Sequence, residues 1–245
     1  GTSSLDETLT AAFAQSRVQL GKLRVLSGVR LEQVDVEAFA YIKGVKKPTT
    51  PITDPRELAR FDYNNPRVGT GSTRSLFPSA HLTYQFTKGL QARASWSNGI
   101  GRPPTANLLP VEAVNEAAET LTINNQAIKP QFTKNYDATL EYYFEPVGMV
   151  SVGYFQKNIR DYIVSNVLGL VPSGADNGYN GDYAGYTLRS QTNAGGARID
   201  GWEFSYQQQL TFLPGLLRGL GVFANYTRLR TEGNFGGATV RRTGQ

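Results

Sequence analysis

The feature that most constrains this chain is a two-residue alternation of apolar and polar side chains that recurs in long runs. Residues 76–86 show it clearly. One face there carries Leu76, Ala80, Leu82, Tyr84 and Phe86, and the other carries Ser79, His81, Thr83 and Gln85. Similar runs occupy residues 22–32, 90–97, 136–144, 149–163, 198–213 and 217–229. Because successive side chains of a β-strand point to opposite faces, the pattern predicts strands with one apolar face. We therefore expect an all-β, antiparallel chain of about eight strands in four hairpins.

The connections between these runs alternate between short and long. Short, turn-forming segments lie near Leu20-Gly21 and at residues 87–89, 145–148 and 213–215. Long polar stretches lie between them, at residues 43–75, 99–133 and 165–197, and the residues after Leu229 are polar as well. Tight turns at one end and long loops at the other are typical of outer-membrane β-barrels. A soluble β-sandwich or β-propeller also alternates, but it does not account for the long loops.

Composition agrees with a barrel wall. No run approaches the roughly 18 apolar residues of a membrane helix, and the mean hydropathy is -0.35, which suits strands with only one apolar face. The segment 22–42 is long enough to project beyond a bilayer. Aromatic residues near the expected strand ends predict an interfacial girdle, formed by Tyr41, Phe86, Trp96, Tyr142, Phe144, Phe212 and Tyr226.

Few residues offer chemistry. The chain has no cysteine and one histidine, so we expect neither a metal site nor a cofactor. The net charge of +5 fits contact with an anionic membrane surface or no specific partner, of which we favour the second, and we expect no nucleic-acid partner. Ser79 and His81 share a strand face, but such neighbours are commonly two polar residues on a wet surface, so we expect no enzyme. Six charges on the inner faces are expected to pair with one another rather than to guide a substrate: Arg24, Arg30, Glu32, Arg93, Glu141 and Glu203.

The segment 176–186 is the most distinctive polar loop. Its carboxylates do not complete a Ca²⁺-binding pattern, whereas tyrosines beside Asp and Asn suit sugar rings and their hydroxyls. A solvated, turn-rich loop remains the alternative. We take seven residues of this loop as candidates for substrate capture: Asp176, Asn177, Tyr179, Asn180, Asp182, Tyr183 and Tyr186.

Several motifs, in order along residues 8–230, resemble the barrel of TonB-dependent receptors. Leu76-Phe77-Pro78-Ser79 is similar to the family's strand entry, and Ser97-Asn98-Gly99-Ile100-Gly101-Arg102-Pro103-Pro104 to its strand-to-loop exit. The strongest match is Ile128-Lys129-Pro130-Gln131 followed by Asn135-Tyr136-Asp137 and Leu140-Glu141-Tyr142-Tyr143. Residues 154–163 and 197–203 continue the series, and Gln126-Ala127 departs from the family's Asn-Pro.

The resemblance implies that residues 1–245 are part of a single 22-stranded barrel domain in the bacterial outer membrane, with the plug domain and the terminal strands outside this chain. It further implies TonB-dependent uptake of a scarce nutrient, a carbohydrate in preference to a siderophore, with this segment supplying wall and extracellular loops. Expected partners are the TonB complex, the nutrient, and the lipid and lipopolysaccharide of the membrane. Arg102 is expected to fix a bend. The alternative is a small self-closing barrel with a structural, anchoring or adhesin role.

Overall fold

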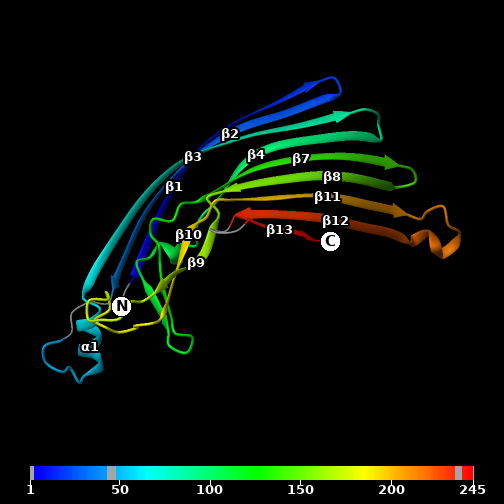
Figure 1. The fold of residues 1–245 in the computed structure, drawn as a ribbon. Helices are drawn as coiled ribbons and strands as arrows, with labels where there is room; N and C mark the ends of the chain where they lie inside the picture. The colour runs from blue at the N-terminus through cyan, green and yellow to red at the C-terminus, as the bar shows by residue number, and fades with distance from the viewer. Residues whose placement is uncertain (1–2, 43–47, 235–238, 245) are drawn as a thin grey trace.

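A computed structural model describes residues 3–42, 48–234 and 239–244 of the chain (Figure 1). The strands are β1 (Ser3–Leu20), β2 (Leu23–Ile42), β3 (Asn65–Gln85), β4 (Leu90–Gly101), β5 (Glu112–Asn115), β6 (Thr120–Ile123), β7 (Gln131–Phe144), β8 (Gly148–Arg160), β9 (Ile163–Leu170), β10 (Thr187–Asn193), β11 (Gly196–Gln209), β12 (Gly221–Asn234) and β13 (Thr239–Gly244). The helices are α1 (Pro55–Asp62) and two 3₁₀ turns, η1 (Thr105–Leu108) and η2 (Gly215–Gly219). None of the helices in these ranges is long and apolar enough to cross a membrane.

Nine strands form one large antiparallel sheet in the order β1-β2-β3-β4-β7-β8-β11-β12-β13. The four predicted hairpins are confirmed, because β1–β2, β3–β4, β7–β8 and β11–β12 are joined across the short segments. The first turn places Gly21 at φ +59°, a conformation that glycine adopts without steric cost. We call the end of the sheet with these hairpin turns the turn end, and the opposite end the loop end.

The prediction of continuous loops was wrong in three places. The described part of the 43–75 stretch contains α1 and the first half of β3, while residues 43–47 lie outside the described part of the chain. Residues 65–75 lack an apolar alternation, yet they pair in register with β2, so backbone hydrogen bonds override the weak side-chain signal. The other two stretches contain β5, β6, β9 and β10, which form a four-stranded sheet.

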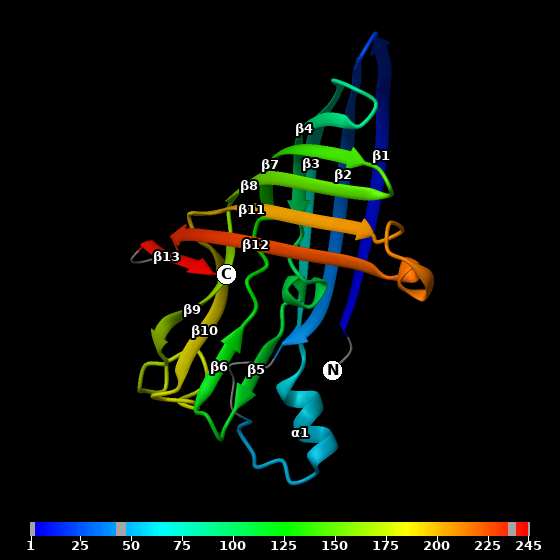
Figure 2. The same ribbon diagram turned by 90° about the vertical axis from the view of Figure 1, so that its right-hand side faces the viewer.

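The end of the chain was also predicted as polar loop and instead continues the sheet. Strand β12 runs to Asn234, and β13 pairs with it antiparallel, which gives nine strands in place of about eight. Gln245 lies outside the described residues. Within the described ranges β1 and β13 are the two edges of the sheet and do not pair, so the sheet is open (Figure 2). The self-closing alternative is therefore not the arrangement observed.

The sheet curves, and the four-stranded sheet lies on its concave side at the loop end (Figures 1 and 2). We call the concave side the inner face and the convex side the outer face. Toward the turn end, the outer face is apolar across neighbouring strands. One row of this face runs across six neighbouring strands, from β2 to β11, and consists of Val25, Leu82, Ala94, Ala138, Tyr154 and Trp202. We call this region the apolar band.

Beyond Glu32 the alternation along β2 reverses. Gln33, Asp35 and Glu37 follow Leu31 on the outer face, whereas Val34, Val36 and Ala38 occupy the inner face. An outer face that changes from apolar to acidic marks the level at which the wall leaves the hydrocarbon. The prediction that 22–42 overshoots a bilayer is consistent with this reversal.

Aromatic rings border the apolar band at the turn end and also lie within it. Near the turn end, Tyr84 packs against Phe86 with centroids 4.8 Å apart, and Tyr142 against Phe144 at 5.7 Å. Within the band, Tyr154 lies 5.1 Å from Trp202. Of the predicted girdle, Tyr41 was misplaced, because it pairs with Phe39 at the far end of β2 and lies well beyond the band.

Candidate functional site

The loop end of the inner face is the only place in the described chain where a second sheet meets the wall. The small sheet has the order β5-β6-β10-β9, with β10 parallel to β6 and antiparallel to β9. Its strands come from the two long connections that follow β4 and β8, so residues far apart in sequence build one structure. Leu121, at 0% exposure, and Val171, at 2%, form its core.

Asparagine side chains fasten this sheet to the ends of the wall strands. The amide nitrogen of Asn193 donates to the carbonyls of Lys129 and Asp161, each at 2.8 Å, and its side-chain oxygen accepts from the Lys129 backbone N–H at 2.8 Å. Asn124 likewise donates to the carbonyls of Ala106 and Leu109, at 2.7 and 3.0 Å. Hydrogen bonds of a side-chain amide to several backbone groups fix a loop without regular secondary structure.

The wall and the loops also share an apolar contact. A cavity of about 130 Å³ lies between the reversed part of β2, with Val36 and Ala38, and the loop residues Leu108 and Ile128. Ala38 is 2% exposed and Ile128 is 6% exposed, so both side chains are buried where the loops cover the wall. The inner face of the wall is thus apolar where loops cover it. This explains why the apolar residues of β2 change from the outer face to the inner face beyond Glu32, while apolar and polar residues still alternate.

A cluster of charges closes the same region toward the apolar band. The Arg102 guanidinium lies 2.8 Å from a Glu32 carboxylate oxygen and 4.0 Å from Glu7, and Glu32 also accepts from Arg30 at 2.6 Å. Arg102 therefore ties the loop that follows β4 to β1 and β2, a contact that the expected role in fixing a bend did not include.

The predicted pairing of inner-face charges is confirmed for four of the six residues. Arg30 pairs with Glu32, and Arg93 pairs with Glu141 at 3.2 Å. Arg24 instead donates to the Gln19 side chain at 3.2 Å. Glu203 lines a polar hollow of the inner face beside Lys157.

The seven predicted capture residues lie together in the loop between β9 and β10, but Asn177 faces inward. Its amide nitrogen donates to the carbonyls of Pro172 and Asp182, at 3.1 and 2.9 Å. Its oxygen accepts from the backbone N–H groups of Tyr179 and Gly181, each at 2.9 Å. Asn177 thus holds the loop in shape, while Asp176 and Asp182 are exposed. Asn180 is half-buried and adopts φ +58°.

The three tyrosines of this loop pack in a row, the first pair edge to face and the second pair tilted. The Tyr179 and Tyr183 ring centroids are 5.8 Å apart, and those of Tyr183 and Tyr186 are 5.5 Å apart. All three are half-buried. Burial raises the pKa of the Tyr179 phenol above its ordinary value, and the negative charge of Glu112 raises that pKa further. The phenol therefore stays a neutral hydrogen-bond donor at physiological pH.

Other candidate chemistry does not assemble in the described ranges. Ser79 and His81 both lie on the inner face of β3, opposite Gly28 and Leu26, and no hydrogen bond joins them within the described structure. Across residues 3–42, 48–234 and 239–244, no group of three or more His, Cys, Asp or Glu side chains is placed to hold a metal ion. Sequence reasoning missed Asn193 and Asn124, because single asparagines in a polar stretch carry no pattern.

An open, curved antiparallel sheet with an apolar outer band, aromatic borders and loops folded over its inner face defines the class: a wall segment of an outer-membrane type β-barrel. The family model for the "TonB dependent receptor-like, beta-barrel" matches residues 2–244, so the chain belongs to this family. Barrels of this family lie in the outer membrane. No curated protein sequence matches the chain.

Solved structures show the same fold at low sequence identity. The ferric-catecholate import receptor Fiu from E. coli K12 is similar, with a TM-score of 0.58 and 15% identity over 94% of this chain and 28% of that chain. The hemophore receptor HasR from Serratia marcescens, solved with its hemophore and heme, has a TM-score of 0.54 and 10% identity, over 93% of this chain and 41% of that chain. The ferric enterobactin receptor from Pseudomonas aeruginosa has a TM-score of 0.52 and 12% identity, over 98% of this chain and 41% of that chain. The chain therefore spans less than half of these proteins.

Proposed function

We propose that the protein takes part in TonB-dependent uptake of a scarce nutrient, either a siderophore or a carbohydrate, across the outer membrane. This chain supplies barrel wall and extracellular loops. The observation that carries the proposal is the small sheet folded over the inner face at the loop end, within a chain that matches the family's barrel from residue 2 to 244. A wall that only anchored the membrane would not need loops fastened over its lumen.

The orientation follows from the same features. The turn end faces the periplasm, and the loop end faces outward, because outer-membrane barrels have short periplasmic turns and long extracellular loops. The proposed complete protein is one large barrel of 22 strands with a plug formed by other residues, through which TonB supplies energy. Its outer face contacts lipid and lipopolysaccharide. The solved neighbours are named for ferric catecholate, heme and ferric enterobactin, which supports a metal complex at least as well as a carbohydrate.

Uptake is tested in cells that carry the whole receptor. Labelled ferric catecholate, heme and oligosaccharides are supplied in turn, with and without TonB. We expect one of them to accumulate only when both the receptor and TonB are present. Equal accumulation without TonB contradicts the proposal, as does the failure of every labelled compound to accumulate above receptor-free cells.

Within this function, the loop with Tyr179, Tyr183 and Tyr186 is the proposed capture element. Its ring edges and exposed carboxylates suit a ligand with both flat and hydroxylated parts. Deleting residues 176–182 from the receptor is expected to weaken binding of the accumulated compound by at least about tenfold, the effect of one or two lost hydrogen bonds. Leu216→Ala is the control, since Leu216 is 99% exposed at the turn end. Unchanged binding after the deletion would remove the loop from the site.

A further inference from the structure

The cavity between the wall and the loops has two glycines in its floor. On the inner face, the pairing of β2 with β3 places Val36 opposite Gly71 and Ala38 opposite Gly69. Gly69 is covered, because a Cβ atom there would lie 2.6 Å from the Gln126 side chain, whereas a Cβ atom at Gly71 would meet nothing within 4 Å. Gly71 is exposed and lines the cavity, so a ligand can enter at this position. We call this cavity, with Gly71 in its floor, the glycine pocket.

Apolar side chains surround Gly71. The lining includes Val36 from β2, and Leu108 and Ile128 from the loops that cover the wall. The pocket volume of about 130 Å³ is close to that of an apolar cavity of about 150 Å³ that can hold a benzene ring. An empty apolar cavity of this size weakens the packing around it, so a ring that fills it is favoured.

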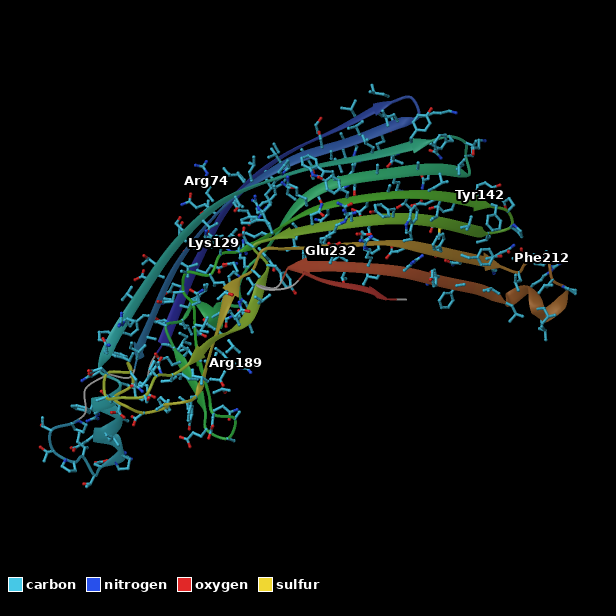
Figure 3. All side chains as sticks on the ribbon, viewed as in Figure 1. Arg74, Lys129, Tyr142, Arg189, Phe212 and Glu232 are labelled. Carbon is cyan, nitrogen blue, oxygen red and sulfur yellow. The ribbon has the colours of Figure 1, made fainter. Side chains whose placement is uncertain are left out.

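The opposite end of the glycine pocket is polar. Ser75 lies further along β3 than Gly71, in register with Glu32, whose carboxylate bonds to Arg102 at 2.8 Å. Ser75 is 9% exposed, and its hydroxyl makes no hydrogen bond within the described structure. Figure 3 shows Arg74 on the convex side of β3, so its neighbour Ser75 points to the concave side, where it lines the pocket. A buried hydroxyl without a partner costs free energy, so a ligand that supplies the hydrogen bond is favoured.

This lining distinguishes between classes of ligand. A sugar ring carries several hydroxyls, and most of them would be buried against Val36, Leu108 and Ile128 without partners. A small ion would lose its hydration shell there, and Glu32 and Arg102 already neutralise each other. An aromatic ring with one hydroxyl satisfies both ends of the pocket.

We propose that the glycine pocket binds one hydroxylated aromatic ring of the nutrient, with the ring over Gly71 and its hydroxyl bonded to Ser75. The ring contacts Val36 of the wall and Ile128 of the loops, so its binding also holds the loops against the wall. The ring is assigned to the nutrient because the pocket lies on the inner face at the loop end, so this assignment rests on the proposed function.

The test uses the whole receptor in lipid nanodiscs, without TonB, and follows the binding of 4-fluorophenol and fluorobenzene by fluorine NMR. Gly71→Val fills the pocket, and Gly219→Val is its control, because a Cβ atom at Gly219 also meets nothing within 4 Å. Ser75→Ala removes the hydroxyl, and Ser72→Ala, on the outer face of the same strand, is its control. Partition of the probes into lipid is the same for all variants, so differences between variants report binding to the pocket.

We expect Gly71→Val to weaken the binding of both probes at least about tenfold, because a ring no longer fits, and Gly219→Val to leave it unchanged. Ser75→Ala should weaken 4-fluorophenol binding about fivefold, the effect of one lost hydrogen bond, and change fluorobenzene binding less than about twofold. Ser72→Ala should change neither. The compound that accumulates in the uptake experiment should displace 4-fluorophenol from the wild-type receptor.

Equal binding of 4-fluorophenol by the wild type and Gly71→Val overturns the proposal. If Gly71→Val does not fold, Ser75→Ala decides, because an unchanged preference for 4-fluorophenol over fluorobenzene also overturns it. A compound that accumulates in cells but does not displace the probe overturns the assignment of the ring to the nutrient. The proposed function fails separately, when no compound accumulates, and the probe measurements then still decide whether the pocket binds a ring.

Discussion

The two halves of β2 are continuous in backbone but opposite in chemistry. Toward the turn end, Val25 and Leu31 face outward and Arg30 faces inward, whereas beyond Glu32 the acidic residues face outward and Val36 and Ala38 face inward. Both halves have the same strand geometry, so the difference lies in what surrounds them. The outer face of the first half meets lipid, whereas the outer face of the second half meets water and its inner face is covered by loops. The comparison shows that the apolar face of a strand is the face that contacts lipid or other side chains. The alternation alone therefore does not tell which face points into the lumen.

The largest effect is expected from a charge placed in the apolar band. Leu140→Arg puts a guanidinium on the outer face of β7, where Arg near the bilayer centre costs about 2–4 kcal/mol. Urea unfolding of the receptor in lipid vesicles measures this cost. Ser72→Arg, on the outer face beside Asp35 but beyond the band, is expected to change stability by less than about 0.5 kcal/mol. Equal costs at both positions would place the membrane at a different height.

A smaller effect is expected where the inner face becomes apolar. Ile128→Val removes one methylene from the contact between loop and wall and should cost about 1 kcal/mol. The loss concerns the docking of the loops, so protease cleavage between residues 102 and 130 should accelerate about fivefold while the barrel stays folded. Leu170→Val, at a residue that is 65% exposed, deletes the same group and should have no effect. Faster unfolding of the whole sheet, with cleavage of the loops unchanged, would refute the assignment.

The charge cluster between the two halves should contribute less again. Arg102→Ala breaks the contact with Glu32, but Glu32 keeps Arg30, and the Arg102 side chain is 34% exposed. We expect a loss of about 0.5 kcal/mol at low salt that fades as salt is added. Hydrogen exchange of the loop that follows β4 detects it, and Arg56→Ala on α1 is the control. A loss that is independent of salt would point to packing of the side chain instead.

The smallest effect is a pH dependence confined to the loop with the tyrosine row. Because the folded loop raises the pKa of Tyr179, the neutral phenol stabilises the loop fully below its ordinary pKa of about 10. That stabilisation is lost as the pH rises through the raised value. Tyr179→Phe should abolish this alkaline loss, as followed by loop proteolysis against pH, with Tyr63→Phe on the exposed end of α1 as control. A wild-type loop that is unchanged by alkali would show that the phenol does not couple to loop folding.

The fold was largely predictable because outer-face residues such as Leu82 and Leu140 repeat every second position over long runs. Residues 65–75 and strand β13 escaped prediction, since their pairing depends on the neighbouring strand rather than on an apolar face of their own. The tyrosines of the candidate loop were enough to predict it from the sequence. The role of Asn177 could not be predicted, because the folded conformation of the loop decides whether an amide side chain bonds to solvent or to the backbone.

The reversal at Glu32 also sets the vertical position of the wall. A strand advances about 3.3 Å per residue, so sliding inward by two residues, roughly 7 Å, carries Gln33 into hydrocarbon and brings Asp35 to its border. Sliding outward instead strips Leu31 of lipid and leaves it facing water. Both displacements cost free energy, so the strand fixes the depth of the wall in the membrane and holds the loops at a constant height above the bilayer.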